Sequence, residues 1–180
     1  MAEPEFEAQT GMELQDIDAF HADATAALRL YFNPDESGFK VRFSFLALEQ
    51  VSTQLQMRLS ELDLQSCLAL LACIEARFQM DFRGRCRDRL KDELSRHFRG
   101  IAKKRKRQGA RISLEEDIFE AWRLHSSDLI SFIGDLRSAF KFRHWLAHGR
   151  YWVPKLGRKY DYETLFLMAE AVFSSFPFTY

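Results

Sequence analysis

The sequence predicts an all-α protein, a single-domain helical bundle of five to six helices. Apolar residues recur every three or four positions along most of the chain, which is the period of an amphipathic helix. Gly, Pro and Val are scarce beside Leu, Ala, Glu and Arg, so the composition favours helix over strand. The 180 residues, of which 47% are hydrophobic and 29% charged, suffice for one domain with its own core.

The first part of the chain is expected to be a flexible acidic tail over residues 1–12, followed by one helical domain over 13–180. The tail lacks the apolar stretch of a secretory signal. No apolar run approaches the roughly 18 residues that a membrane helix needs, so we expect no membrane partner. Cys67, Cys73 and Cys86 form no Cys-x-x-Cys pair, and we expect reduced thiols in a cytoplasmic protein.

In the first half of the chain, apolar residues at helical spacing predict a first helix over about residues 13–32. The run 33–38, Asn-Pro-Asp-Glu-Ser-Gly, then forms a turn. A second helix is expected over about 41–62. A third begins with Asp63 as its cap and continues to about residue 102, with Gly84 as a point where it can bend or break.

The second half is expected to begin with a loop over the basic tract 103–109. Residues 113–116, Ser-Leu-Glu-Glu, fit a capping box and open a short helix. Another helix starts near residue 126 and ends at Gly149, which is suited to a helix C-terminus. Asp161 can cap the final helix.

The most informative stretch is residues 143–150, Arg-His-Trp-Leu-Ala-His-Gly-Arg, at the end of the expected late helix. The apolar stripe of that helix consists of Leu129, Ile133, Leu136 and Phe140. The next positions on the stripe are Arg143, His144 and His148. Because an unpaired buried Arg would cost several kcal/mol, these residues must either meet a partner or line a cleft.

These three side chains have the chemistry needed to hold a phosphate and move protons beside it. Arg143 and His148 are about 140° apart on an ideal helix, so they meet one ligand only if the helix ends there. A His can act as base or acid near neutral pH, and an Arg stays charged. In principle this set cleaves RNA through its own 2′-OH without a metal. His144-x3-His148 is also a metal-ligand spacing, but no Glu follows the first His, and we expect no metal.

The pattern Arg143-x4-His148, with a polar residue directly after the Arg, resembles the HEPN superfamily. Its members are small all-α proteins with an Arg-x4–6-His motif on a late helix. Many are metal-independent endoribonucleases that act as toxins of toxin–antitoxin systems or in defence against phage. The resemblance implies that Arg143 binds the phosphate, that His148 is the catalytic histidine and that His144 orients its neighbours. It also implies a homodimer with one composite site, no cofactor, and an antitoxin protein as a partner.

Residues 83–111 hold half of the positive charge of the chain, with thirteen Lys and Arg against three acidic residues. Because the net charge of the whole chain is zero, this asymmetry indicates an anionic partner. The candidate RNA-binding residues of this segment are Lys103, Lys104, Arg105, Lys106 and Arg107. Binding there would be non-specific and salt-sensitive. A solvated surface is the alternative.

Arg150 and Tyr151, directly after the motif, are further candidates for RNA contact. Tyr151 could stack on a base, and packing in the core or at a dimer interface is the alternative. In the HEPN subgroup paired with nucleotidyltransferase antitoxins, a Tyr often lies two residues after the His. Arg150 occupies that position here, so we do not expect a partner of that kind to modify the Tyr.

Glu75 is a candidate supporting residue for the site because it lies within a strongly apolar stretch. A partly buried carboxylate there needs a cation, for which Arg143 is one candidate. Arg77, Arg137 and solvent are the alternatives. The function expected is therefore a metal-independent endoribonuclease that leaves a 2′,3′-cyclic phosphate. The alternatives are a non-catalytic HEPN scaffold that binds RNA or a protein through residues 83–111, and a structural role within a defence complex.

Overall fold

The computed structural model describes residues 13–180, and every regular element in this range is helical, which confirms the predicted all-α bundle. The predicted number of five to six helices was wrong, because this range holds seven α-helices. The tail predicted over residues 1–12 lies outside the described residues. The helices are α1 (Leu14–Tyr31), α2 (Phe39–Arg42), α3 (Leu48–Arg87), α4 (Glu93–Arg107), α5 (Glu120–His125), α6 (Ile130–Ala147) and α7 (Tyr162–Ser175), with a π-helical segment η1 (Leu114–Phe119) before α5 and a 3-10 turn η2 (Ser127–Leu129) before α6.

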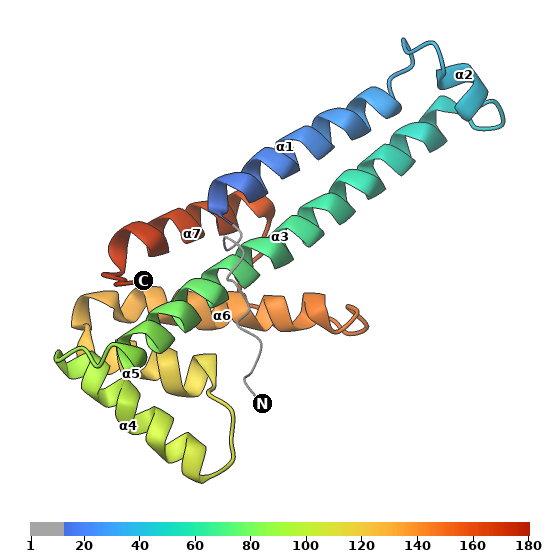
Figure 1. Cartoon of the computed structure of the whole chain (residues 1–180). Helices are drawn as coiled ribbons and strands as arrows, with labels where there is room; N and C mark the ends of the chain where they lie inside the picture. Colours follow the sequence, from blue (N-terminus) through green and yellow to red (C-terminus); the bar gives the residue numbers. More distant parts are fainter. Residues whose placement is uncertain (1–12) are drawn as a thin grey trace, which may run out of the picture.

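The spine of the fold is α3, a single helix of 40 residues against which α1, α4, α6 and α7 all pack (Figure 1). The predicted division at Asp63 was wrong, because Asp63 lies in the middle of this helix. Its carboxylate receives a hydrogen bond of 2.9 Å from His21 of α1 instead of capping a helix. No Pro or Gly occurs before Gly84 in α3, so nothing in the local backbone chemistry ends the helix earlier.

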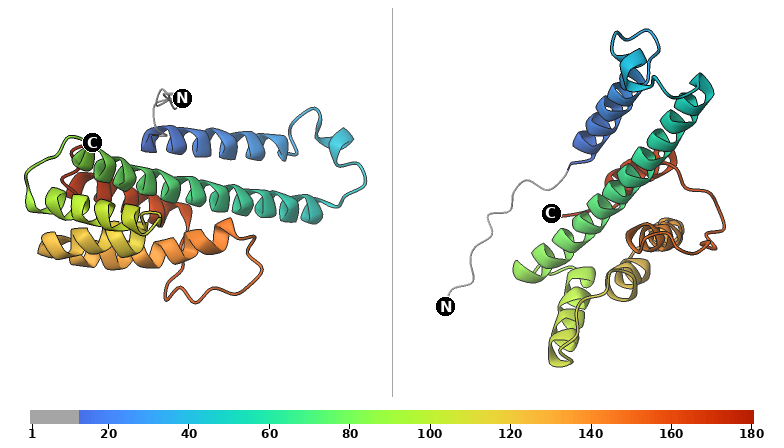
Figure 2. Two further views of the ribbon diagram at one scale, coloured as in Figure 1. Left: turned by 60° about the horizontal axis from the view of Figure 1, so that its bottom comes forward. Right: turned by 90° about the vertical axis from the view of Figure 1, so that its right-hand side faces the viewer.

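Two hydrophobic clusters hold the helices together. The larger one surrounds the second half of α3 and includes Phe78, Trp122 and Leu136, each at most 1% exposed. The smaller one lies at the far end of α1 and α3, where these two helices and α2 extend beyond the other helices as an arm (Figure 2). Its members are Phe32, Phe39, Phe43 and Val51.

The basic tract belongs to the last turn of α4, so the loop predicted over 103–109 was wrong for residues 103–107. The predicted continuation of one helix to residue 102 was also wrong, since α3 ends at Arg87 and α4 begins anew. Asp92 caps α4 by accepting a hydrogen bond from the Ser95 backbone N–H. Lys and Arg are good helix formers, and their charge is favourable at the C-terminal end of a helix dipole.

The two other caps, at Ser113 and Asp161, are confirmed. The capping box predicted over 113–116 was wrong in its second half, because the Ser113 N–H donates to Asp117 Oδ2 at 2.8 Å and not to Glu116. Ser113 caps η1 by accepting a hydrogen bond from the backbone N–H of Glu116, and Asp161 caps α7 by accepting one from Thr164. Both are short-range contacts between residues three positions apart. Short side-chain acceptors at these positions satisfy N–H groups that the first helical turn leaves unpaired.

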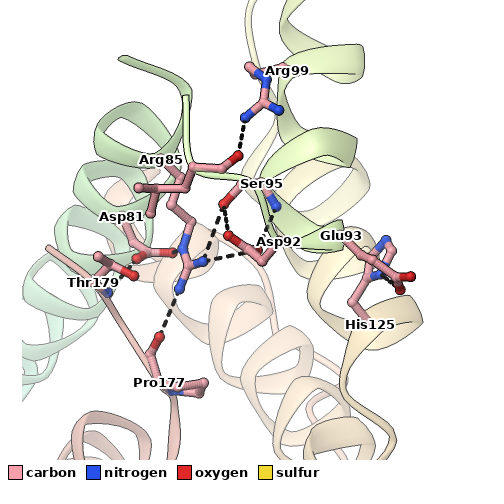
Figure 3. A network of polar contacts seen from close by, with 10 residues as sticks. Asp81, Arg85, Asp92, Glu93, Ser95, Arg99, His125, Pro177 and Thr179 are labelled. Atoms are coloured by element: carbon pink, nitrogen blue, oxygen red, sulfur yellow. Dashed lines mark hydrogen bonds and ion pairs between the residues drawn. The ribbon is translucent and has the colours of Figure 1, made fainter. Parts of the chain in front are cut away.

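A buried ion pair joins α3 to the C-terminal segment (Figure 3). Arg85 donates from Nε to Asp81 Oδ2 at 2.7 Å and from Nη2 to the carbonyl oxygen of Pro177 at 2.8 Å. The second oxygen of Asp81 accepts the Thr179 N–H at 2.8 Å. Asp81 is 0% and Arg85 6% exposed, so both charges depend on these partners.

The same guanidinium reaches α4. Nη1 of Arg85 lies 3.3 Å from Asp92 Oδ1 and 3.3 Å from Ser95 Oγ, the residues that form the N-terminal cap of that helix. Burial raises the pKa of the Asp81 carboxyl, while the Thr179 N–H and Arg85 oppose this shift. Arg85 therefore links α3, the start of α4 and the C-terminal segment.

We expect Arg85→Met to lower the free energy of unfolding by about 3–5 kcal/mol, because it leaves the Asp81 carboxylate buried without its cation. Arg87→Met is the matched control. The Arg87 side chain is exposed and pairs with Asp88 at the surface, so little change is expected. Urea denaturation followed by circular dichroism measures both variants, and equal losses would contradict the role given to the buried pair.

Candidate functional site

The motif lies where α6 ends, as the sequence predicts. Arg143 and His144 belong to the last turns of the helix, and His148 is the residue directly after it. Gly149 follows with φ +81°, and the Arg150 N–H returns to the Trp145 carbonyl oxygen at 3.2 Å. This six-to-one hydrogen bond across a left-handed Gly is a Schellman motif, which stops the helix at this point.

The apolar stripe of α6 leads to an ion pair. Its four predicted residues are all buried, and Arg143 follows them half-buried. Nη2 of Arg143 lies 2.9 Å from Glu75 Oε2 of α3, so Arg143 is the partner that Glu75 finds. Of the two alternative cations, Arg77 lies over the Phe173 and Phe178 rings and Arg137 pairs with Glu120.

Arg143, His144 and Glu75 together line a pocket of about 350 Å³. The rest of its lining comes from Phe140 and from residues 113–116, at the start of η1. Nε of Arg143 is buried and has no hydrogen-bond partner among the described residues. The pocket thus combines a guanidinium, an imidazole and carboxylates in a polar setting.

Sequence reasoning missed the part of this pocket contributed by residues 113–116. Ser113, Glu115 and Glu116 are about thirty positions from Arg143, and no spacing relates the two segments. They meet because η1 and α6 both pack against α3. Only the cap at Ser113 was visible in the sequence, and it indicated a helix start, not a site.

His148 is exposed and does not line the pocket that Arg143 and His144 share. Its ring lies against His144, with 4.2 Å between the two ring centroids and a tilt of 50°. Within one copy of the chain, His144 therefore connects the pocket to His148. The prediction that His144 supports the other two residues agrees with this position but is not tested by it.

The loop after the motif is held in place by two contacts. The Trp145 indole N–H donates to the Trp152 carbonyl oxygen at 2.6 Å. Arg150 forks onto Glu61 of α3, with Nη1 2.8 Å from Oε2 and Nη2 3.0 Å from Oε1. This hydrogen bonding lowers the pKa of Glu61. Arg150 is thus already paired with Glu61, whereas Tyr151 is 83% exposed and contacts the Trp152 ring edge-on, with 4.6 Å between the ring centroids.

The predicted RNA-binding tract, residues 103–107, also contains one residue that is already paired within the protein and several that are not. Arg105 forks onto Asp117 of η1, with Nε 2.8 Å from Oδ2 and Nη2 2.9 Å from Oδ1. It therefore fastens α4 to η1. The other members are exposed and form no ion pair with any residue that the structure describes, namely Lys103, Lys104, Lys106 and Arg107.

A contact between the half-buried His97 and the exposed His125 was not anticipated from the sequence. Nδ1 of His97 and Nε2 of His125 are 2.9 Å apart, and Glu93 lies 3.9 Å from Nδ1 of His125. Over residues 13–180, no group of three or more His, Cys, Asp or Glu side chains is arranged to hold a metal ion. None of the described helices is long and apolar enough to cross a bilayer.

Comparisons with models of known protein families, with curated proteins and with solved structures found no match. The resemblance to the HEPN superfamily therefore rests on the motif Arg143-x4-His148 and on the all-α fold. It stays a prediction. The geometry of the pocket does not depend on that resemblance, because it follows from the Arg143–Glu75 ion pair and the residues that line the pocket.

The position of His148 depends on the helix end, and one glycine after α6 and one within it test this. We expect Gly149→Ala to lower the free energy of unfolding by about 1–2 kcal/mol, because φ is +81° there. Gly134→Ala, in the middle of the same helix, should raise it by about 0.5–1 kcal/mol. A Cβ meets nothing within 4 Å at either position, so only the backbone conformation differs. Thermal and urea unfolding measure the change in the free energy of unfolding for both variants. A change of the same sign in both would contradict the assigned helix end.

Proposed function

We propose that this protein is a metal-independent endoribonuclease of HEPN type. The observation that supports this most is the convergence of Arg143, His144 and Glu75 in one pocket, with His148 packed on His144. A fixed cation beside two imidazoles matches the needs of RNA cleavage by an internal nucleophile. The reaction needs no group that the chain itself lacks.

In the proposed reaction, Arg143 binds the non-bridging oxygens of the scissile phosphate and offsets the charge that develops on the phosphorane. A histidine accepts the proton of the 2′-OH as its oxygen bonds to phosphorus. The bond from phosphorus to the 5′-oxygen breaks, and that oxygen takes up a proton from solvent water. The products are a 2′,3′-cyclic phosphate and a 5′-hydroxyl. We assign the proton transfer to His148 and its positioning to His144.

Glu75 holds Arg143 in place before RNA binds. Both side chains are about one-third exposed, at 30% and 37%, so the pair is worth less than about 1 kcal/mol. A phosphate, which accepts two hydrogen bonds from one guanidinium, can therefore share or replace this partner. Glu75 is a positioning residue in this mechanism.

We further propose that two copies of the chain complete the site. His148 lies outside the pocket of its own copy and is exposed, so it is available to the pocket of another copy. A homodimer with a composite site, as the family resemblance implies, would bring His148 of one protomer toward Arg143 of its partner. Such a protein acts as a toxin or as an effector of phage defence, located in the cytoplasm and restrained by an antitoxin protein.

A non-catalytic scaffold that binds RNA or a protein is the second candidate function. The exposed cations Lys103, Lys104, Lys106 and Arg107, which form no ion pair with any described residue, favour it because they can bind phosphates without any cleavage. An affinity for RNA that survives Arg143→Ala, falls with salt, and is never accompanied by cleavage would select this function over the nuclease.

We expect the purified protein to cleave labelled single-stranded RNA in the presence of EDTA and to leave 2′,3′-cyclic phosphate ends. Arg143→Ala and His148→Ala should each lower the rate by about 10²–10⁴-fold, because each removes a group used in the transition state. His144→Ala should have a smaller effect. Lys141→Ala, exposed on the same helix, is the control and should cut like the wild type. Intact RNA at every pH, or full activity of His148→Ala, would reject the proposal.

We expect induced expression of the chain in a bacterial host to arrest growth, since cleavage of cellular RNA stops protein synthesis. His148→Ala should relieve the arrest at equal protein level, while Lys141→Ala should not. Growth curves and immunoblots measure both. Arrest that persists in His148→Ala would show that the effect does not depend on the proposed chemistry.

A further inference from the structure

A second, larger pocket lies beside the candidate site and shares Glu75 with it. Its volume of about 570 Å³ falls within the roughly 300–1,000 Å³ typical of small-ligand sites. Residues of α3, of α4 and of the segment 110–112 line it. The next residues of the same segment, 113–116, line the Arg143 pocket. The two pockets are therefore neighbours along one continuous stretch of chain.

The lining of this second pocket is strongly cationic. Arg83, Arg105, Lys106 and Arg111 contribute to it, and Glu75 is its one carboxylate. Arg105 is neutralised by Asp117, and Glu75 by Arg143.

The other three cations have no such partner. Arg83, Lys106 and Arg111 are exposed, and the side chain of none of them forms an ion pair or hydrogen bond with a residue in the described part of the chain. Three like charges gathered around one hollow repel one another, and an anion bound between them would relieve this repulsion. The pocket is therefore suited to a negatively charged ligand.

The same pocket has an apolar part that an inorganic anion would not use. Phe82 is 5% exposed, and Ala102 and Ile112 are half-buried beside it. The Gln79 side chain adds an amide that can both donate and accept hydrogen bonds. A cationic rim, an apolar wall and one amide correspond to the phosphate and the base of a nucleotide.

We propose that this pocket is a subsite for one nucleotide of single-stranded RNA, its phosphate held by Arg83, Lys106 and Arg111 and its base placed against Phe82 and Ile112. The proposal rests on the proposed function in taking RNA as the ligand. Because Glu75 borders both pockets, a nucleotide here lies next to the phosphate bound by Arg143. The strand then runs from the end of α6 toward α4.

Binding of a short, fluorescently labelled 2′-O-methyl RNA without a terminal phosphate tests this, since that RNA lacks the hydroxyl needed for cleavage. The triple variant Arg83→Ala, Lys106→Ala and Arg111→Ala should weaken binding at least about tenfold. It should also lower the slope of log K against log salt by about 0.7, the value for one phosphate contact. Fluorescence anisotropy over a range of salt concentrations measures both.

The matched control removes the same charge from three exposed positions outside the pocket that have no assigned role in RNA binding, through Lys91→Ala, Arg96→Ala and Lys141→Ala. We expect it to weaken binding by less than about threefold. Equal weakening by the two triple variants would overturn the proposal, because it would show that only the diffuse positive field matters.

A variant without any charge change separates the pocket from electrostatics. Ala110→Trp places a large side chain at a lining position that is exposed and outside any helix, so the fold should tolerate it. It should weaken RNA binding about as much as the cationic triple variant, while the circular dichroism spectrum and melting temperature stay unchanged. Wild-type affinity in this variant would overturn the subsite.

A free nucleotide could supply the same phosphate as an RNA strand, so AMP and inorganic phosphate are measured as competitors. We expect both to displace the oligonucleotide only weakly. AMP binding that depends on Arg83, Lys106 and Arg111, with oligonucleotide binding that does not, would overturn the RNA subsite. Cleavage is recorded separately: a wild type that binds through the pocket but never cuts rejects the nuclease and leaves the subsite standing. A wild type that cuts RNA, but whose RNA binding is unchanged in the pocket variants, supports the nuclease and rejects the subsite.

Discussion

The buried pair between Asp81 and Arg85 is the polar interaction that joins the start of α4 and the C-terminal segment to α3. A charge taken out of water is tolerated only while each of its partners stays in place. The partners of Arg85 lie on α3, at the cap of α4 and in the C-terminal segment, so the pair sets where α4 starts relative to α3. That placement brings Arg83 of α3 and Lys106 of α4 to the same pocket. This ion pair, the Phe82–Phe98 ring contact and the Arg105–Asp117 pair together bring basic side chains of α3 and α4 around one hollow.

Local signals in the sequence predicted the helix ends well. The caps at Ser113 and Asp161 and the stop at Gly149 each depend on residues within five positions, and all three are present. The break proposed at Asp63 failed for the opposite reason. An Asp preceding an apolar run is a local cap signal, but His21 of α1 satisfies this carboxylate from 42 positions away. The uninterrupted helical propensity around it then prevails.

In the candidate site, too, the local features were predictable from the sequence, whereas the contacts between distant segments were predictable only in part. The pairing of Glu75 with Arg143 was among the predicted alternatives, because a carboxylate and a guanidinium on apolar stripes each need a partner. Periodicity placed His144 and His148 on one face of a helix, yet the helix stops between them and only His144 lines the pocket. The contribution of residues 113–116 could not be predicted at all, since it arises from packing between segments that share no sequence pattern.

Glu75 connects the two parts of the proposed mechanism, because it borders both the Arg143 pocket and the basic pocket. When a phosphate takes over Arg143, the carboxylate of Glu75 loses its counter-ion. The cations that line a pocket with Glu75 and have no ion-pair partner among the described residues are those that we propose to hold the neighbouring nucleotide. Release of Glu75 toward them would weaken their hold on that nucleotide, whereas a strand bound in both pockets needs Glu75 to keep part of its contact with Arg143. Sharing of one guanidinium between a carboxylate and a phosphate is therefore favoured over complete exchange, because only sharing leaves the cations of the basic pocket available to RNA.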